Sequence, residues 1–301
     1  MRRLGPLALA ALTLTLTAAF GAVAGAPARA DEGIGGQPPR FGENPRRDYE
    51  SSQRFAVELK FGPYSPNIDA SPGLNGNHPF ADLFPPDKGK SRPPGKLLTQ
   101  VEFDYQFWHR WYGNFAIGST AGYYRRTTHS FAYNTNPSTG AETQSCNPSS
   151  DPTNTNMCVR SGDTTALNIV PLSMLFVYRF DYLAQRYKIP FIPYFKIGLA
   201  YYAWWIENGG GFLSIAQFTP AGSTQSQGGW GGTFGWTMNP GGAFLLDVLD
   251  PSAARTIDAE LGINHTYLFC EFNYADITGF GAKNKMDLSD TTLNAGIAFE
   301  F

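Results

Sequence analysis

The segment "TTLNAGIAFEF", Thr291 to Phe301, constrains the fold more than any other stretch of the sequence. Apolar side chains alternate along it with small or polar ones, which is the period of two of a β-strand with one apolar face. An apolar residue at a frayed end gains nothing in water. The pattern therefore predicts a strand whose apolar face is covered up to Phe301. That face comprises Leu293, Ala295, Ile297, Phe299 and Phe301.

The first thirty residues predict export from the cytoplasm. Arg2 and Arg3 precede an apolar Leu/Ala/Thr run, which closes on Ala28-Arg29-Ala30, a small-x-small cleavage pattern. The alternative, a transmembrane anchor, is disfavoured because the run is short and contains Gly and Pro. We predict a signal peptide over residues 1–30, a periplasmic linker over 31–53 and one domain over 54–301. Without the three arginines of the signal peptide, 20 basic residues face 25 acidic ones, so no nucleic-acid partner is expected.

The composition of the chain favours a membrane β-barrel. Charged residues make up 16% and aromatic residues 15% of the sequence, whereas an ordinary soluble domain has about 25% charged residues. The nearest candidate for a membrane helix, residues 189–206, contains Pro190, Pro193 and Lys196, which argue against a spanning helix. An exported chain that is rich in aromatic residues, poor in charge and not helical is typical of an outer-membrane barrel.

Eight segments repeat the period of two, and their connections alternate roughly between long and short. These features predict an all-β fold, an eight-stranded antiparallel transmembrane β-barrel with long external loops and short periplasmic turns. Pro171 predicts a bulge in the fourth segment, and the sixth is Gly-rich and broken by Pro240. The segments are residues 54–61, 100–108, 114–124, 167–180, 194–205, 229–249, 264–274 and 291–301.

A secreted β-sandwich is the alternative architecture, since its strands alternate in the same way. Three features favour the barrel: polar faces that combine Gly, Ala and charged residues, aromatic residues clustered near strand ends, and the terminal Phe301. In lipid every backbone group needs an internal partner, so the last strand is expected to pair with the first. This architecture predicts location in the cell outer membrane of a Gram-negative bacterium.

Several segments carry a resemblance to known proteins. The terminal strand with Phe299 and Phe301 resembles the assembly signal that the outer-membrane insertion machinery reads. "FAVELKFGPYSPNID", "VYRFDYLAQRYKIPFIPYFKIGLAYY" and "INHTYLFCEF" resemble an outer-membrane β-barrel family common in myxobacteria and their relatives, small barrels of the OmpA/OmpX kind. The resemblance covers residues 54–301 and implies a fold and a location. It implies no biochemical activity.

The inward face of the predicted barrel carries charged residues on most strands. An eight-stranded barrel has an interior just wide enough for side chains to fill it. Charges in such a space are expected to pair, since an unpaired buried charge costs several kcal/mol. Lys60 is expected to reach Glu102 or Glu300, while Arg179 and Lys196 are expected to share acids such as Glu271 or Asp104 across the lumen. The predicted lumen network is Glu58, Lys60, Glu102, Asp104, Arg179, Lys196, His265, Glu271 and Glu300.

Few residues offer catalytic or metal chemistry. His265 lies on the same face as Glu271, as a lipid-modifying enzyme would require, but no serine accompanies it, and a hydrogen-bonded lumen histidine is the favoured interpretation. Asp69, Asp82 and Asp87 form either a calcium-binding surface or a solvated, proline-stiffened loop. We expect no enzyme activity, no cofactor and no metal.

Two further features yield structural predictions. Cys146 and Cys158 lie in one long external loop of an exported protein and are expected to form a disulfide, the alternative being two free thiols. Cys270 is expected to stay reduced and to face lipid. "DPSAARTIDAEL" predicts a short amphipathic helix in a periplasmic turn, with Asp250 as its cap.

At the level of function, the sequence favours a monomeric outer-membrane barrel that acts through its external loops in envelope structure or surface interaction. The expected partners are outer-membrane lipids, lipopolysaccharide and the outer-membrane assembly machinery. Two alternatives remain open at this point. One is a narrow transporter of small or hydrophobic molecules, and the other is a lipid-modifying membrane enzyme.

Overall fold

The computed structural model describes residues 54–74, 76–90, 92–110, 112–131, 134–135, 142–143, 160–187, 189–216 and 227–301. The predicted signal peptide, the predicted linker over 31–53, and both Cys146 and Cys158 lie outside the described residues. Statements about the fold and its contacts below refer to the described residues.

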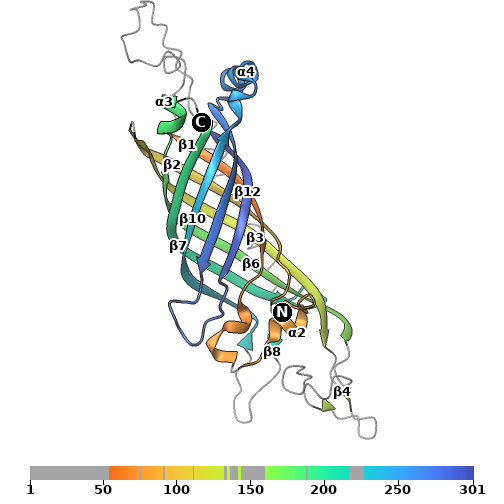
Figure 1. The fold of residues 1–301 in the computed structure, drawn as a ribbon. Helices are drawn as coiled ribbons and strands as arrows, with labels where there is room; N and C mark the ends of the chain where they lie inside the picture. Colours follow the sequence, from red (N-terminus) through yellow and green to blue (C-terminus); the bar gives the residue numbers. More distant parts are fainter. Residues whose placement is uncertain are drawn as a thin grey trace, which may run out of the picture.

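Eight long strands form one closed antiparallel barrel, in which each strand pairs with its neighbours in the chain and the last pairs with the first. Figure 1 shows the strands strongly tilted around the barrel. The predicted fold class is confirmed. The strands are β1 (Phe55–Tyr64), β2 (Lys96–Arg110), β3 (Gly113–Phe131), β6 (Arg160–Arg179), β7 (Phe191–Glu207), β10 (Trp230–Leu245), β11 (His265–Asp276) and β12 (Asp290–Glu300).

The barrel closes where β1 meets β12. The ladder runs from Ala56 opposite Glu300 to Phe61 opposite Ala295. Phe301 extends it, because its N–H donates to Phe55 O at 2.8 Å and its carbonyl accepts from Arg54 N at 2.9 Å and from Phe55 N at 3.2 Å. The pairing of first and last strands that the terminal segment predicted is therefore confirmed, and it includes Phe301.

Removal of Phe301 is expected to reduce the amount of barrel that reaches the outer membrane. The deletion takes away these three backbone hydrogen bonds at the seam together with the aromatic ring of the predicted assembly signal. Phe301→Ala keeps the backbone hydrogen bonds and removes only the aromatic ring. Comparing the two variants therefore separates the effect of strand pairing from the effect of the predicted assembly signal. The measurement is the quantity of heat-modifiable protein in purified outer membranes. Normal accumulation of the deletion variant would contradict this account of the seam.

The two faces of the strands differ as lipid and lumen require. Met174 is 67% exposed and Leu199 is 66% exposed on the outer surface, and Cys270 is exposed there as a free thiol. Inward positions of the same strands are small, polar or charged. Because a closed barrel with an apolar exterior is the β-form that can cross a bilayer, we place the chain in the cell outer membrane.

Two proline predictions differ from the structure. Pro171 causes no bulge: the β3–β6 ladder is interrupted between Leu172 and Ile169 but resumes in the same register. Pro240 does not break the sixth strand, since β10 runs through it and the β10–β11 ladder again resumes without a shift. A proline has no N–H to donate. In each strand the missing N–H interrupts the pairing with one neighbour only. The pairing with the other neighbour, β7, continues through the proline.

The short helices lie at opposite ends of the barrel (Figure 1). At the end that carries the C-terminus, α3 (Tyr182–Tyr187) links β6 to β7, and η4 (Leu246–Val248) and α4 (Pro251–Leu261) link β10 to β11. The predicted helix is thus confirmed as α4, and Asp250 caps it by accepting from the N–H groups of Ser252 and Ala253.

The opposite end, which we call the external end, carries the connections between β1 and β2, β3 and β6, β7 and β10, and β11 and β12. They include η1 (Ile68–Ala70), η2 (Pro72–Leu74), α2 (Pro79–Leu83) and two small ribbons, β4 (Asn134–Thr135) with β5 (Glu142–Thr143) and β8 (Ile215–Ala216) with β9 (Gln227–Gly228). Among the described helices, none combines the length and the apolar character needed to cross a membrane.

Candidate functional site in the barrel lumen

Strand periodicity brings eight charged side chains into the middle of the barrel. β1, β2, β6, β7, β11 and β12 each contribute at least one of them, because inward positions recur at every second residue. Seven are almost fully buried, and the side chain of Arg179 is 11% exposed. Five carboxylates face three cations in this lumen network, which comprises Glu58, Lys60, Glu102, Asp104, Arg179, Lys196, Glu271 and Glu300.

Lys196 bridges the full width of the lumen. It lies on β7, four strands from β1 in either direction around the ring. Its Nζ is nevertheless 2.5 Å from Glu58 Oε2 on β1 and 2.6 Å from Glu102 Oε1 on β2. Glu58 and Glu102 are direct partners in the β1–β2 ladder, where two like charges would repel each other. The ammonium group of Lys196 neutralises this repulsion from the far wall.

The other two cations complete the set. Lys60 Nζ lies 2.6 Å from Glu102 Oε2 and 3.0 Å from Glu271 Oε1. Arg179 Nη2 lies 2.7 Å from Glu58 Oε1 and 2.8 Å from Asp104 Oδ2. With five acids for three bases, one buried carboxylate oxygen, Asp104 Oδ1, has no hydrogen-bond partner among the described residues.

Neutral side chains satisfy other carboxylate oxygens of the network. Thr120 Oγ1 donates to Glu102 at 2.8 Å, Tyr194 Oη donates to Glu271 at 3.2 Å, and Tyr267 Oη donates to Glu300 at 2.6 Å. Gln106 also donates to Glu300 and accepts from Asn114. The predicted network did not include these residues. Their inward parity was visible in the sequence and could have identified them.

His265 stands apart from the ion pairs. Its Nδ1 lies 2.6 Å from Asp247 Oδ2, at the end of the barrel that carries α4. Asp247 belongs to η4, which folds back against the start of β11, and its other oxygen accepts from Thr266 N at 3.1 Å. His265 was predicted to belong to the lumen network, but its carboxylate partner is Asp247 at this end of the barrel. At the same end, Nε2 of another histidine, His109, lies 3.5 Å from Asp181 Oδ2.

Apolar layers lie on both sides of the lumen network. Toward the external end, Tyr64, Tyr124 and Tyr202 pack with Phe80 and Phe84 from the first connection and with residues of the last connection. Tyr64 Oη donates to Leu288 O at 2.7 Å, which ties the first strand to the last connection. Toward the other end, a second buried cluster contains Ile192, Tyr194, Tyr267, Phe269 and Ala298. Buried apolar side chains thus lie on both sides of the charged network.

The acidic residues of the first connection have structural partners. The Asp69 carboxylate accepts from Phe80 N at 2.8 Å and from Ala81 N at 2.9 Å, at the start of α2. Asp87 pairs with Lys90 at 3.0 Å. Among the described residues, the three acids close enough to share a metal are Glu58, Glu102 and Asp104, with one ligand atom of each within 4.8 Å of the others. Lys196 and Arg179 already neutralise them.

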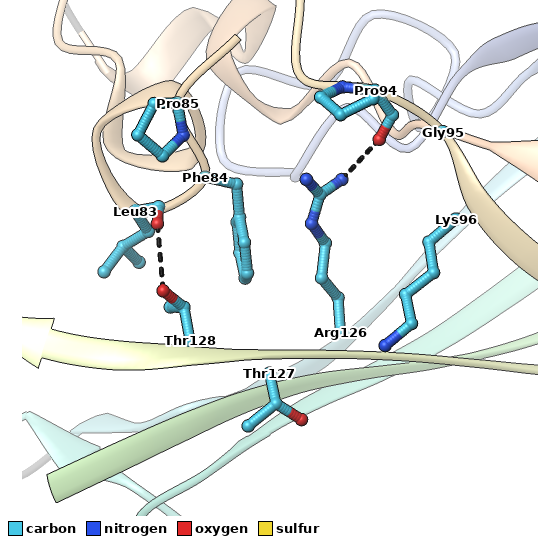
Figure 2. Close-up of a pocket in the computed structure, with 9 residues that line it drawn as sticks. All are labelled: Leu83, Phe84, Pro85, Pro94, Gly95, Lys96, Arg126, Thr127 and Thr128. Carbon is cyan, nitrogen blue, oxygen red and sulfur yellow. Dashed lines mark hydrogen bonds between the residues drawn. The ribbon is translucent and has the colours of Figure 1, made fainter. Parts of the chain in front are cut away.

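Two cavities lie at the external end. One of about 370 Å³ lies between the first connection and β3, and one of about 820 Å³ lies within the first connection around His78 and Phe80. Figure 2 shows the smaller one, which Arg126 enters from β3. Both of these cavities are therefore lined by residues of the external end.

No family model matches this sequence, and no curated protein matches it. Solved structures with a similar fold include outer-membrane barrels. The three described next do not test the resemblance to the myxobacterial family, which stays a prediction. The attachment invasion locus protein Ail of Yersinia pestis, solved with the heparin analogue sucrose octasulfate, is 9% identical, with a TM-score of 0.35 over 84% of this chain and 99% of Ail. OprG of Pseudomonas aeruginosa is 11% identical, with a TM-score of 0.41 over 84% and 97%. The N-terminal barrel domain of OprF from the same organism is 10% identical, with a TM-score of 0.32 over 83% and 100%.

Proposed function

We propose that this protein is a closed outer-membrane barrel that acts at its external end, in envelope structure or surface interaction, and does not conduct solutes through its lumen. The observation that carries the proposal is the Lys196 bridge, which joins opposite walls of the barrel at 2.5 and 2.6 Å. A side chain that spans the lumen leaves no continuous water column beside it in a barrel of eight strands.

The packing above and below the bridge supports the same conclusion. The apolar cluster toward the external end includes side chains from the first and last connections. The cluster toward the other end narrows the lumen with Tyr194, Tyr267 and Phe269. Water or a polar solute on the axis would have to displace these side chains and break buried ion pairs, each of which is costly to leave unpaired.

The remaining surface divides between lipid and the external medium. The strands present apolar side chains to lipid, so outer-membrane lipids are the partners of the barrel wall. The external connections are left as the seat of interactions with lipopolysaccharide or other surface molecules. We propose no enzyme activity, because the pair of His265 and Asp247 lies at the end of the barrel opposite these connections. We also propose that the protein is a monomer and that the outer-membrane assembly machinery inserts it.

Solute flux into liposomes tests this proposal against the transporter alternative. Proteoliposomes that contain the purified barrel are expected to swell in arabinose or glycine no faster than protein-free liposomes, because the lumen is blocked. Liposomes with a general porin serve as the positive control. Swelling that rises with the amount of folded barrel would reject the closed lumen and favour a narrow transporter.

A further inference from the structure

The smaller external cavity arises from unequal strand lengths. β2 begins at Lys96, whereas β3 continues to Phe131, so the part of β3 beyond Tyr123 has no β2 partner. The first connection covers this edge, with Thr128 Oγ1 donating to Leu83 O at 3.1 Å and Arg126 donating to Pro94 O at 2.7 Å. A cavity of about 370 Å³ remains, lined by residues 83–85, 94–96 and 126–128.

The charge of this cavity is positive. Lys96 and Arg126 line it, and no aspartate or glutamate does. Neither cation forms an ion pair with a carboxylate of the described residues. In the same part of the barrel, Arg92 lies 3.6 Å from Asp290 and Arg125 lies 3.2 Å from Glu207. Lys96 and Arg126 thus line one cavity, and neither has a carboxylate partner among the described residues.

Arg126 is held in a fixed position. Its guanidinium lies 4.4 Å from the ring centre of Phe84 and 5.5 Å from that of Phe80, which are cation–π contacts. Figure 2 shows the side chain extending from β3 toward Pro94. The bond to Pro94 O uses one of the five N–H groups of the guanidinium. A fixed planar fork and a flexible ammonium group that line the same cavity suit an oxyanion, because arginine binds phosphate oxygens in pairs and lysine adds a point charge.

We propose that this cavity binds the phosphomonoester group of a phosphorylated sugar. Lys96 and Arg126 would take the phosphate, and the hydroxyl group of Thr128, on the same face of β3 as Arg126, lies in the lining for a further hydrogen bond. The rings of Phe84, Pro85 and Pro94 supply apolar walls for the C–H face of a sugar ring. The volume lies within the range of small-ligand sites, about 300–1,000 Å³. Such a phosphate comes either from a lipid headgroup of the outer leaflet or from a free sugar phosphate.

This inference deepens the proposed function by giving the external end a ligand class. The test uses the full barrel in detergent micelles and measures binding of glucosamine 1-phosphate and of diphosphoryl lipid A, with glucosamine and dephosphorylated lipid A as neutral counterparts. The wild type is expected to bind the phosphorylated members of each pair. The double variant Lys96→Gln/Arg126→Gln is expected to lose at least tenfold in affinity. Binding of lipid A alone identifies a lipid headgroup as the ligand, and binding of both probes identifies the phosphosugar itself.

A matched variant controls for net charge. Lys88→Gln/Lys90→Gln removes the same charge from the same connection but lies outside the cavity lining, and it is expected to bind as the wild type does. Heat-modifiable gel mobility confirms that each variant is folded. Should the double variant misfold, Lys96→Gln alone carries the test, since this side chain is exposed, and a severalfold loss is expected. The inference would be overturned if the wild type bound phosphorylated and unphosphorylated probes equally well. It would also be overturned if both double variants lost the same amount of affinity. Neither outcome affects the flux result, so failure of this site and failure of the closed lumen are distinguishable.

Discussion

Replacing Lys196 with methionine is expected to lower the free energy of unfolding of the barrel by about 3–5 kcal/mol. The change removes the ammonium group that lies 2.5 Å from Glu58 and 2.6 Å from Glu102, while both carboxylates stay buried. Lys60 and Arg179 then remain as the only cations for five acids of the network. Urea unfolding of the folded protein in lipid vesicles, followed by tryptophan fluorescence, measures the loss.

A surface lysine offers the matched control for this variant. Lys90 forms an exposed ion pair with Asp87, and exposed pairs contribute about 0–1 kcal/mol, so Lys90→Met is expected to have little effect. Adding Glu58→Gln and Glu102→Gln to Lys196→Met removes the uncompensated charges and is expected to recover part of the stability. A loss for Lys196→Met no larger than that for Lys90→Met would show that the bridge does not stabilise the barrel.

Gly296→Val is expected to prevent closure of the barrel. Gly296 lies on β12 opposite Lys60 of β1 and Phe269 of β11. A Cβ at this position would overlap the backbone oxygen of Leu59 and would lie 2.7 Å from Cζ of Phe269. Since Leu59 O is a backbone atom of the adjacent strand, no rotamer change relieves the overlap. Overpacking of this kind costs about 1–3 kcal/mol or more, and here it acts at the seam that closes the ring.

Gly162→Val is the control for the seam variant. Gly162 also lies in a strand, β6, but a Cβ there meets nothing within 4 Å, and valine favours the strand conformation. This variant is expected to assemble like the wild type. The fraction of heat-modifiable barrel after refolding into vesicles measures both variants. Equal yields for Gly296→Val and Gly162→Val would contradict the close approach of β12 to β1.

The parts of the fold that follow from strand periodicity could be predicted from the sequence. A period of two assigns each side chain to lumen or lipid, so the inward positions of Glu58, Lys196 and Glu271 were visible before their partners were known. The order of strands around the ring followed from their order along the chain, because an antiparallel barrel joins neighbours by turns. Of the expected partners, Lys60–Glu102 and Arg179–Asp104 are ion pairs of the structure.

Features that depend on tertiary contact could not be predicted in the same way. The first connection reads as a polar, proline-rich loop, yet Phe80 and Phe84 from it pack over the lumen. No pattern in the sequence places η4 against β11, which is what brings Asp247 to His265. The lengths of β3 and β6 were also underestimated from the sequence. Both strands continue beyond the segment in which apolar residues alternate, and this continuation contains polar residues such as Arg125, Arg126 and Thr165.

Single-channel recording in a planar bilayer tests the closed lumen most directly. Folded wild-type protein inserted at neutral pH is expected to give no stable conductance steps above the bare bilayer, because Lys196 and the two apolar layers occlude the axis. Insertion is verified in the same chamber by protease cleavage or antibody binding at the external connections. Large, reproducible steps of uniform size from the inserted wild type would contradict the account, since they require a continuous water path through the barrel.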